Sequence, residues 1–150
     1  MRRKASGRRA APQHARRAAR PRVRRAALLV IGHGSRVASA NRLLRDLARG
    51  LRPLFPGRAV EIAYLEAATP DIRAGIDRCV ARGATRILIV PYFLYLGGHV
   101  RRDLPKAAVA ARRRHAGLEV RIAAHLGLDR RLLAIVADRS RRGLRACRWP

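Results

Sequence analysis

Residues 86–100 read RILIVPYFLYLGGHV, an apolar run followed by aromatic residues, two glycines and a histidine. The first five residues are nearly all apolar and rich in β-branched side chains, which is typical of a parallel strand covered on both faces. Because Pro91 has no N–H group for a hydrogen-bond ladder, we expect the strand to end just before it. Gly97 and Gly98 allow a tight turn. We therefore expect His99 at the end of the sheet, near the start of the next helix.

The same alternation of strand and helix patterns runs through the chain on both sides of this stretch. Short apolar runs predict strands at 26–32, 58–64, 86–90 and 119–123, and apolar residues at helical spacing predict helices at about 38–54, 70–82, 100–114 and 129–142. Strands that alternate with helices pair in parallel through right-handed crossovers. We predict an α/β fold, a single flavodoxin-like domain whose four-stranded parallel sheet has the order 2-1-3-4 and helices on both faces.

Length and composition favour one folded domain with two terminal extensions. A chain of 150 residues with 49% hydrophobic residues can form one core. Residues 1–25 are Arg/Ala-rich and lack apolar periodicity, so we expect a disordered tail, followed by the domain at 26–142 and a short tail at 143–150. The basic tail could contact nucleic acid or act as a targeting peptide, or it could be an unselected extension or the product of a misplaced start site. No apolar run approaches the ~20 residues of a membrane span or resembles a signal peptide, so we expect a cytoplasmic protein.

The charge is strongly positive beyond the tail as well as within it. Lys and Arg number 35 against 9 Asp and Glu, which gives +26. Eleven of the basic residues and none of the acidic ones lie in 1–25, so the other 125 residues still carry +15. Such a field attracts polyanions, among them nucleic acid, anionic lipid surfaces and small polycarboxylates. Genomic base composition is an equally good explanation for the abundance of Arg and Ala.

Three side chains with metal-binding or proton-transfer chemistry follow three of the predicted strands. His33 lies in Gly-His-Gly-Ser-Arg after the first strand, Glu66 follows the second strand, and His99 follows the third. In the order 2-1-3-4, strand 1 lies between strands 2 and 3, so the three loops converge at one end of the sheet. Two imidazoles and a carboxylate suit a divalent first-row metal, and they also suit proton transfer near neutral pH. Taken singly, each could instead cap a helix or lie on the surface.

Other charged side chains near these loops have two interpretations. Arg36, Arg101 and Arg102 lie close in sequence to the two histidines, where guanidinium groups could pair with ligand carboxylates or phosphates. They could equally be solvated arginines of a basic protein. His115 and His125 are interpreted as structural or solvated. Cys79 and Cys147 form neither a disulfide framework nor a metal-ligand pair.

Three motifs resemble a known family. They are Gly-His-Gly-Ser-Arg at 32–36, Tyr-Leu-Glu-Ala-Ala-Thr-Pro at 64–70, and the stretch VPYFLYLGGHVRRDLP at 90–105. They resemble the small class II tetrapyrrole chelatases of the CbiX and SirB type, which act on sirohydrochlorin. The third motif is the specific one, and the resemblance extends over about 28–138. It implies an enzyme that inserts Co²⁺ or Fe²⁺, with Ni²⁺ also possible, into sirohydrochlorin in cobalamin or siroheme biosynthesis, without a prosthetic group.

The resemblance also implies roles for individual residues. His33 and His99 would bind the metal and assist its insertion, with the carboxylate of Glu66 beside them. We expect the substrate to contact residues of the same loops: Ser35, Arg36, Tyr92, Phe93, Leu96, Gly97, Gly98, Arg101 and Arg102. Long family members carry two such domains in tandem, whereas this chain carries one. The resemblance to the short forms therefore predicts a homodimer with the active cleft between subunits.

Two other functions were weighed against this one. A basic nucleic-acid-binding protein is supported by charge alone, because aromatic residues make up only 4% of the chain and no helix-turn-helix, zinc or RNA-recognition signature is present. We expect nucleic acid to bind only non-specifically, through the basic tail. A flavodoxin-like binder of phosphates or nucleotides is disfavoured because no Gly-x-Gly-x-x-Gly or P-loop follows any strand.

Overall fold

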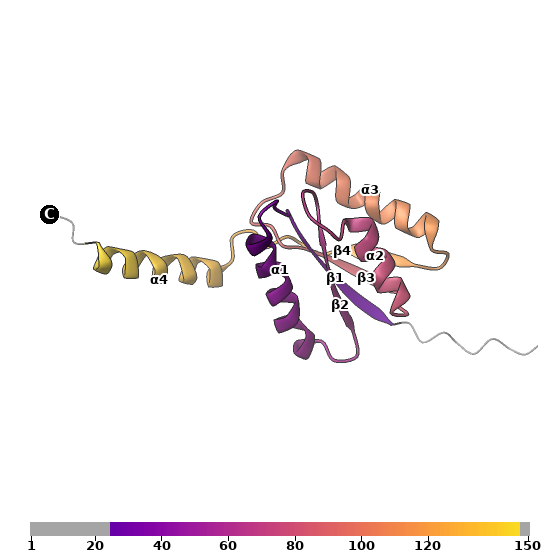
Figure 1. Ribbon diagram of the computed structural model, residues 1–150, viewed down its shortest axis with the longest axis horizontal. Coiled ribbons are helices and arrows are strands. Elements are labelled where there is room, and N and C mark those ends of the chain that lie inside the picture. Colours follow the sequence, from indigo (N-terminus) through magenta and orange to yellow (C-terminus); the bar gives the residue numbers. More distant parts are fainter. Residues whose placement is uncertain (1–24, 148–150) are drawn as a thin grey trace, which may run out of the picture.

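A four-stranded parallel sheet forms the centre of the molecule (Figure 1). The computed structural model describes residues 25–147, so residues 1–24 of the basic tail and the last three residues lie outside the described part. The strands are β1 (Ala26–Gly32), β2 (Ala59–Tyr64), β3 (Arg86–Pro91) and β4 (Glu119–Ile122), and all three pairings are parallel. Their order, β2-β1-β3-β4, confirms the predicted topology.

The helices occupy the predicted positions with small differences at their ends. They are α1 (Ala38–Leu51), which continues into the 3₁₀ turn η1 (Arg52–Leu54), α2 (Ile72–Ala81), α3 (Gly98–Arg114) and α4 (Arg130–Ala146). Helix α3 begins two residues before the expected start at Val100, and α4 continues four residues beyond the expected end at about Arg142. The longer α4 passes through Gly143, because a glycine weakens a helix by only about 1 kcal/mol and does not stop it.

Pro91 does not end β3 as predicted. The strand includes Pro91, which pairs with Ile31 of β1, and the next residue, Tyr92, still donates its N–H to the carbonyl of Ile31 at 2.8 Å. Alternate residues of a parallel strand bond to opposite neighbours. The nitrogen of Pro91 faces the β4 side, where the last paired residue is Ile122. The missing N–H group therefore breaks no bond to β1, and the ladder reaches the start of the site loop.

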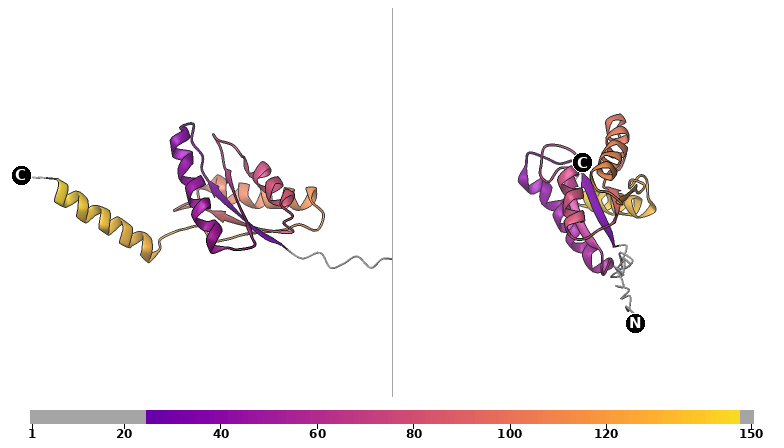
Figure 2. Two further views of the ribbon diagram at one scale, coloured as in Figure 1. Left: turned by 60° about the horizontal axis from the view of Figure 1, so that its bottom comes forward. Right: turned by 90° about the vertical axis from the view of Figure 1, so that its right-hand side faces the viewer.

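Two hydrophobic clusters cover the two faces of the sheet. On one face, α2 and α3 pack with Ile76 and Leu104 against the strand residues Leu29, Ile31 and Ile89. On the other face, α1 packs against β1 and β2 through a second cluster that contains Leu44, Ala48, Val30 and Val60. Helices on both faces are thus confirmed. Helix α4 joins neither cluster and runs away from the sheet in Figures 1 and 2.

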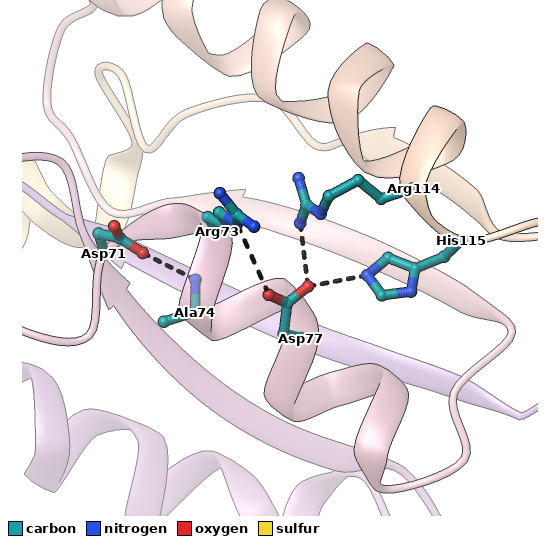
Figure 3. Close-up of polar contacts among 6 residues, drawn as sticks. All are labelled: Asp71, Arg73, Ala74, Asp77, Arg114 and His115. Carbon is teal, nitrogen blue, oxygen red and sulfur yellow. Dashed lines mark hydrogen bonds and ion pairs between the residues drawn. The ribbon is translucent and has the colours of Figure 1, made fainter.

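Polar contacts fix the start of α2 and join its middle to the end of α3 (Figure 3). The side chain of Asp71 caps α2 by accepting the N–H of Ala74 at 2.7 Å. Asp77 accepts hydrogen bonds from Arg114 at 2.9 Å and from His115 at 2.8 Å, which gives His115 the structural role expected of it. In the described part of the chain, no helix is long and apolar enough to cross a membrane.

The contacts of Asp77 predict an acid-dependent contribution to stability. Partial burial would raise the pKa of Asp77, but hydrogen bonds from Arg114 and His115 outweigh it and hold the pKa below the usual 3.8. A lowered carboxyl pKa stabilises the fold above the unfolded pKa, and this gain is lost as pH falls through the folded one. We expect Asp77→Asn to lower the free energy of unfolding by about 1 kcal/mol at pH 7, allowing for solvent screening, and by progressively less below about pH 4.

Urea unfolding at pH 7 and at pH 3 measures this difference. Asp46→Asn is the matched control, because Asp46 forms only an exposed pair with Arg49 within α1, at 3.1 Å, and is expected to change stability little at either pH. An Asp77→Asn effect equal at both pH values would contradict the assignment.

Candidate functional site

The loops that follow β1 and β2 lie directly against each other and bring His33 to Glu66. The ladder between the two strands continues beyond them, since Leu65 N–H donates to the carbonyl of Gly32 at 2.9 Å and Glu66 N–H donates to that of His33 at 3.0 Å. The imidazole Nδ1 of His33 lies 3.2 Å from Oε1 of Glu66. Both side chains are more than half exposed, at 57% and 61%. The predicted convergence of these two loops is therefore confirmed.

Gly34 allows this close approach. Its φ is +93°, in the region that favours glycine, and a Cβ atom built on it would lie 1.9 Å from the backbone oxygen of Glu66. Every other residue would force the second loop away from the first. The glycine after His33 thus sets the distance between the imidazole loop and the carboxylate loop.

Asn41 and Tyr64 hold the His33 loop in place through hydrogen bonds. Neither residue was predicted from the sequence. The side chain of Asn41 donates to the carbonyl of Ser35 at 2.7 Å and accepts the N–H of Ser35 at 3.0 Å. The hydroxyl of Tyr64, which is almost completely buried, donates to the carbonyl of Asn41 at 2.9 Å. One signal was available in the sequence, because a tyrosine at the end of a buried strand needs a hydrogen-bond partner.

The third predicted loop runs from β3 to α3. It starts beside β1, where Tyr92 bonds to Ile31, and it ends at Gly97, the N-cap of α3. His99 is the second residue of α3, as expected from the sequence, and its side chain lies outside the described part. The expected glycine turn is absent, because Gly97 has a φ of −65° and Gly98 does not have a positive φ. A Cβ atom on Gly98 would meet no protein atom within 4 Å, so this glycine borders open space.

The residues expected to contact a substrate fall into two groups. Tyr92, Phe93 and Leu96 are half-buried and pack partly against the core clusters, while Leu94 and Tyr95, which were not predicted, are 59% and 80% exposed. The charged and small polar residues of the loops remain accessible: Arg36, Arg101 and Arg102 are exposed, and Ser35 is half-buried. Tyr95 is therefore the most exposed aromatic side chain of the loop.

The loop after β4 reaches the same end of the sheet. Leu126 N–H donates to the carbonyl of Phe93 at 3.0 Å, which places the half-buried His125 beside the β3 loop. A pocket of about 280 Å³ lies elsewhere, at the opposite ends of β3 and β4, and none of the predicted site residues lines it. We place the candidate site at the strand ends, because the imidazole and carboxylate groups lie there, on an open surface.

This arrangement defines a class of protein. A carboxylate beside Nδ1 of an imidazole favours the tautomer with its proton on Nδ1, which leaves the lone pair of Nε2 free for a cation or a proton. Among the described side chains no group of three His, Cys, Asp or Glu residues lies together, so His33 and Glu66 form a pair there. The fold and the pair define a flavodoxin-like α/β protein whose candidate site, at the carboxyl ends of its strands, has side chains suited to metal binding or proton transfer.

Comparison with known proteins identifies the family within this class. Residues 27–143 match the family model CbiX, and the chain belongs to the CbiX family. It is 32% identical over 112 residues to the chloroplastic sirohydrochlorin ferrochelatase of Arabidopsis thaliana, a match that covers 75% of this chain and 50% of that protein. The sirohydrochlorin chelatase SirB of Bacillus subtilis subspecies spizizenii, solved in complex with cobalt, has a TM-score of 0.72 and 30% identity, over 78% of this chain and 50% of that chain.

The relatives differ in length. The chain spans about half the length of the Arabidopsis thaliana ferrochelatase and of SirB. By contrast, it matches 91% of the sirohydrochlorin cobaltochelatase of Sulfolobus acidocaldarius, at 28% identity over 117 residues and 78% of this chain. Proteins of one and of about two lengths of this unit thus occur among the relatives.

The contact at Gly34 gives a prediction about stability. Gly34→Ala would place a Cβ atom against the Glu66 backbone in addition to straining a positive φ, whereas Gly57→Ala would cause only the strain, because Gly57 has a φ of +73° and no neighbour within 4 Å. We expect Gly57→Ala to cost about 1–2 kcal/mol and Gly34→Ala at least about 1 kcal/mol more. Urea unfolding of both variants measures the difference, and equal losses would show that the two loops are not in contact.

Proposed function

We propose that this protein inserts a divalent metal, Co²⁺ or Fe²⁺, into sirohydrochlorin. The observation that carries the proposal is the contact of His33 with Glu66 at neighbouring strand ends, in a chain of the CbiX family whose relatives include sirohydrochlorin ferrochelatases and cobaltochelatases. Both metals are substrates of the reaction, and nothing in the site calls for a prosthetic group. Ni²⁺ shares their ligand preferences closely enough to be accepted as well.

The metal would be held by His33, Glu66 and His99. Imidazole nitrogen suits Fe, Co and Ni, and the carboxylate adds charge that a divalent cation attracts. The His33 and Glu66 side chains are more than half exposed, which supports a site that releases its metal to a second ligand. His99 lies in the first turn of α3, the helix that follows β3, and β3 lies next to β1 in the sheet, which supports a place for His99 beside the pair.

Metal insertion also requires a destination for two protons. The pyrrole N–H groups of the macrocycle lose them as the metal enters, and a side chain positioned beside the ring can accept them as a general base. Glu66 and the imidazole of His33 lie 3.2 Å apart, so a proton taken up by one can be shared with the other. This pair can therefore act as metal ligand before transfer and as proton acceptor during it.

The surroundings suit a flat polycarboxylate. Arg36, Arg101 and Arg102 are exposed near the two histidines, where they can pair with the acetate and propionate groups of the substrate. Gly98 borders open space, and the 17-residue helix α3 begins there with its positive dipole end. Tyr92, Phe93 and Leu96 expose part of their surface at the same loop and can pack against the ring, with Ser35 and Gly97 at the margins.

A homodimer in the cytoplasm remains our prediction for the state in which the protein acts. Relatives of about twice the matched length support the dimer, because they have room for two such units. Only the positive charge supports the alternative function of nucleic-acid binding. The ferrochelatases and cobaltochelatases among the relatives support metal insertion instead. Specific binding of nucleic acid is therefore not proposed.

Metallation of sirohydrochlorin tests the proposal directly. The purified protein is incubated anaerobically with sirohydrochlorin and Co²⁺ or Fe²⁺, and the absorbance change of the macrocycle gives the rate. We expect His33→Ala and His99→Ala each to reduce the enzymatic rate by about 100-fold or more, and Glu66→Gln by about 10- to 100-fold. His125→Ala is the matched control, since it removes an imidazole at the same end of the sheet and should leave the rate almost unchanged.

Circular dichroism of each variant confirms that the fold is retained. The proposal fails if the parent protein metallates sirohydrochlorin no faster than the protein-free reaction with both ions. The assignment of the site fails if the parent is active and His33→Ala has the same rate as the parent.

A further inference from the structure

Helix α4 has an apolar side that no other part of the described chain covers. At helical spacing one half of the helix carries the following residues, here called the α4 stripe: Leu132, Leu133, Val136, Ala137, Ser140 and Leu144. No residue of α4 is buried, and Leu133, Val136 and Leu144 are 61%, 61% and 66% exposed. Helix α1 is amphipathic too, but its Leu44 and Ala48 are buried against the sheet. Because a helix of 17 residues is marginal in water without packing, the α4 stripe indicates a missing partner.

The other half of α4 is strongly basic. The helix contains six arginines, all exposed, and a single acid, Asp138, which pairs with Arg142 at 3.1 Å. All six arginines lie outside the α4 stripe, and Arg130 and Arg139 border its two edges. An arginine at such an edge lays its aliphatic stem along an apolar surface and keeps its guanidinium group in the polar layer. This division is typical of helices that lie in the plane of a membrane surface.

The path of the chain and the charge of α4 decide between the possible partners. Leu126 N–H bonds to the carbonyl of Phe93, and only residues 127–129 separate this bond from α4, which points away from its own sheet in Figures 1 and 2. A second copy would present positive charge to the arginines, since the chain beyond residue 25 carries +15. Nucleic acid would pair with the arginines but leave the stripe in water. An anionic bilayer satisfies both halves, with phosphates for the arginines and acyl chains for the stripe.

We propose that α4 docks the protein on the surface of a bilayer rich in anionic lipid, with the α4 stripe turned into the acyl boundary. The helix lies on the membrane and does not cross it, because a span needs about 20 predominantly apolar residues, whereas α4 has 17 residues and six arginines. The single tryptophan of the chain, Trp149, follows the helix by three residues in sequence, and tryptophan is enriched at membrane interfaces. This inference depends neither on the proposed chelatase activity nor on the homodimer.

A fluorescent probe on each side of α4 tests the docking and its orientation. The full chain carries Cys147→Ser with either Val136→Cys, in the stripe, or Ile135→Cys, outside it. Cys79 stays unlabelled, because it is buried and burial raises its pKa to about 12. Each variant is labelled with an NBD maleimide, which emits more strongly in apolar surroundings, and is mixed with phosphatidylglycerol vesicles. We expect the emission to rise at least about threefold at residue 136 and to change little at residue 135.

The other results of this experiment overturn the inference. Equal rises at residues 135 and 136 would contradict the orientation of the helix. Sedimentation with the vesicles without a rise at either residue would show that charge alone, including that of the basic tail, causes the binding. A probe at residue 136 that is bright before vesicles are added and does not respond to them would show that protein covers the stripe. None of these readouts depends on metallation, so the chelatase proposal is tested separately.

Vesicles of phosphatidylcholine alone check the choice of anionic lipid. They offer the same acyl boundary without net negative charge, and each arginine near an anionic surface adds to the attraction. We expect the concentration of lipid that gives half of the emission change at residue 136 to be at least about tenfold higher with phosphatidylcholine than with phosphatidylglycerol. Equal concentrations would contradict the role of the arginines.

Two variants of equal charge measure the contribution of the stripe to binding. Val136→Asp and Ile135→Asp each replace a β-branched residue with a carboxylate, and circular dichroism checks that both keep the helix. We expect Val136→Asp to lower the partition coefficient onto phosphatidylglycerol vesicles at least about tenfold, because a carboxylate at the acyl boundary loses water without gaining a partner. Ile135→Asp should lower it less than about threefold, because residue 135 lies in a row with Arg131 and Arg139.

Sedimentation with vesicles is done at moderate salt, which screens the contribution of the basic tail. Equal losses for Val136→Asp and Ile135→Asp would show that the stripe does not enter the bilayer, and would overturn the inference.

Discussion

The backbone contact between the loops after β1 and β2 is the constraint on which the site depends. Two hydrogen bonds extend the β1–β2 pairing past the sheet, and Gly34 is the residue that lets the loops touch. The contact holds the backbones of His33 and Glu66 side by side, so that their side chains can meet at 3.2 Å. Asn41 and Tyr64 then tie the first loop to α1 and β2, so the geometry is determined by elements that also form the core.

The sheet could be predicted well from the sequence because its strands have a clear apolar pattern. Runs such as Leu28–Ile31 and Ile87–Val90 are apolar on both faces, and the helices between them force parallel pairing, so the order could be inferred before the structure. The ends were harder to predict. Pro91 removes one N–H group, and the effect of its loss depends on which neighbour that nitrogen faces, which is a property of the sheet and not of the residue.

The site could be predicted only in part, because side-chain chemistry is visible in the sequence and backbone geometry is not. His33 and Glu66 are recognisable by side-chain chemistry and by their places after strands, whereas the role of Gly34 depends on a φ angle and on a neighbour 32 positions away in sequence. Asn41 supports the loop through its amide group, and nothing about an asparagine in the first turn of a helix predicts that use. The separation of α4 from the sheet could not be predicted either, because its apolar stripe suits packing within one chain or between two.

The solvent exposure of His33 and Glu66 connects the chemistry of the site to the oligomeric state of the protein. His33 and Glu66 are 57% and 61% exposed, and water competes strongly for a cation at such a surface. Transfer of a metal into a ring benefits from a drier site, because each charge interaction is stronger there. A flat substrate lying on the Tyr95 loop would cover one side of the pair, and a second copy held beside it would cover another. On this reasoning, we expect the bound substrate and, in the proposed homodimer, the partner subunit to provide the walls that exclude water from His33 and Glu66.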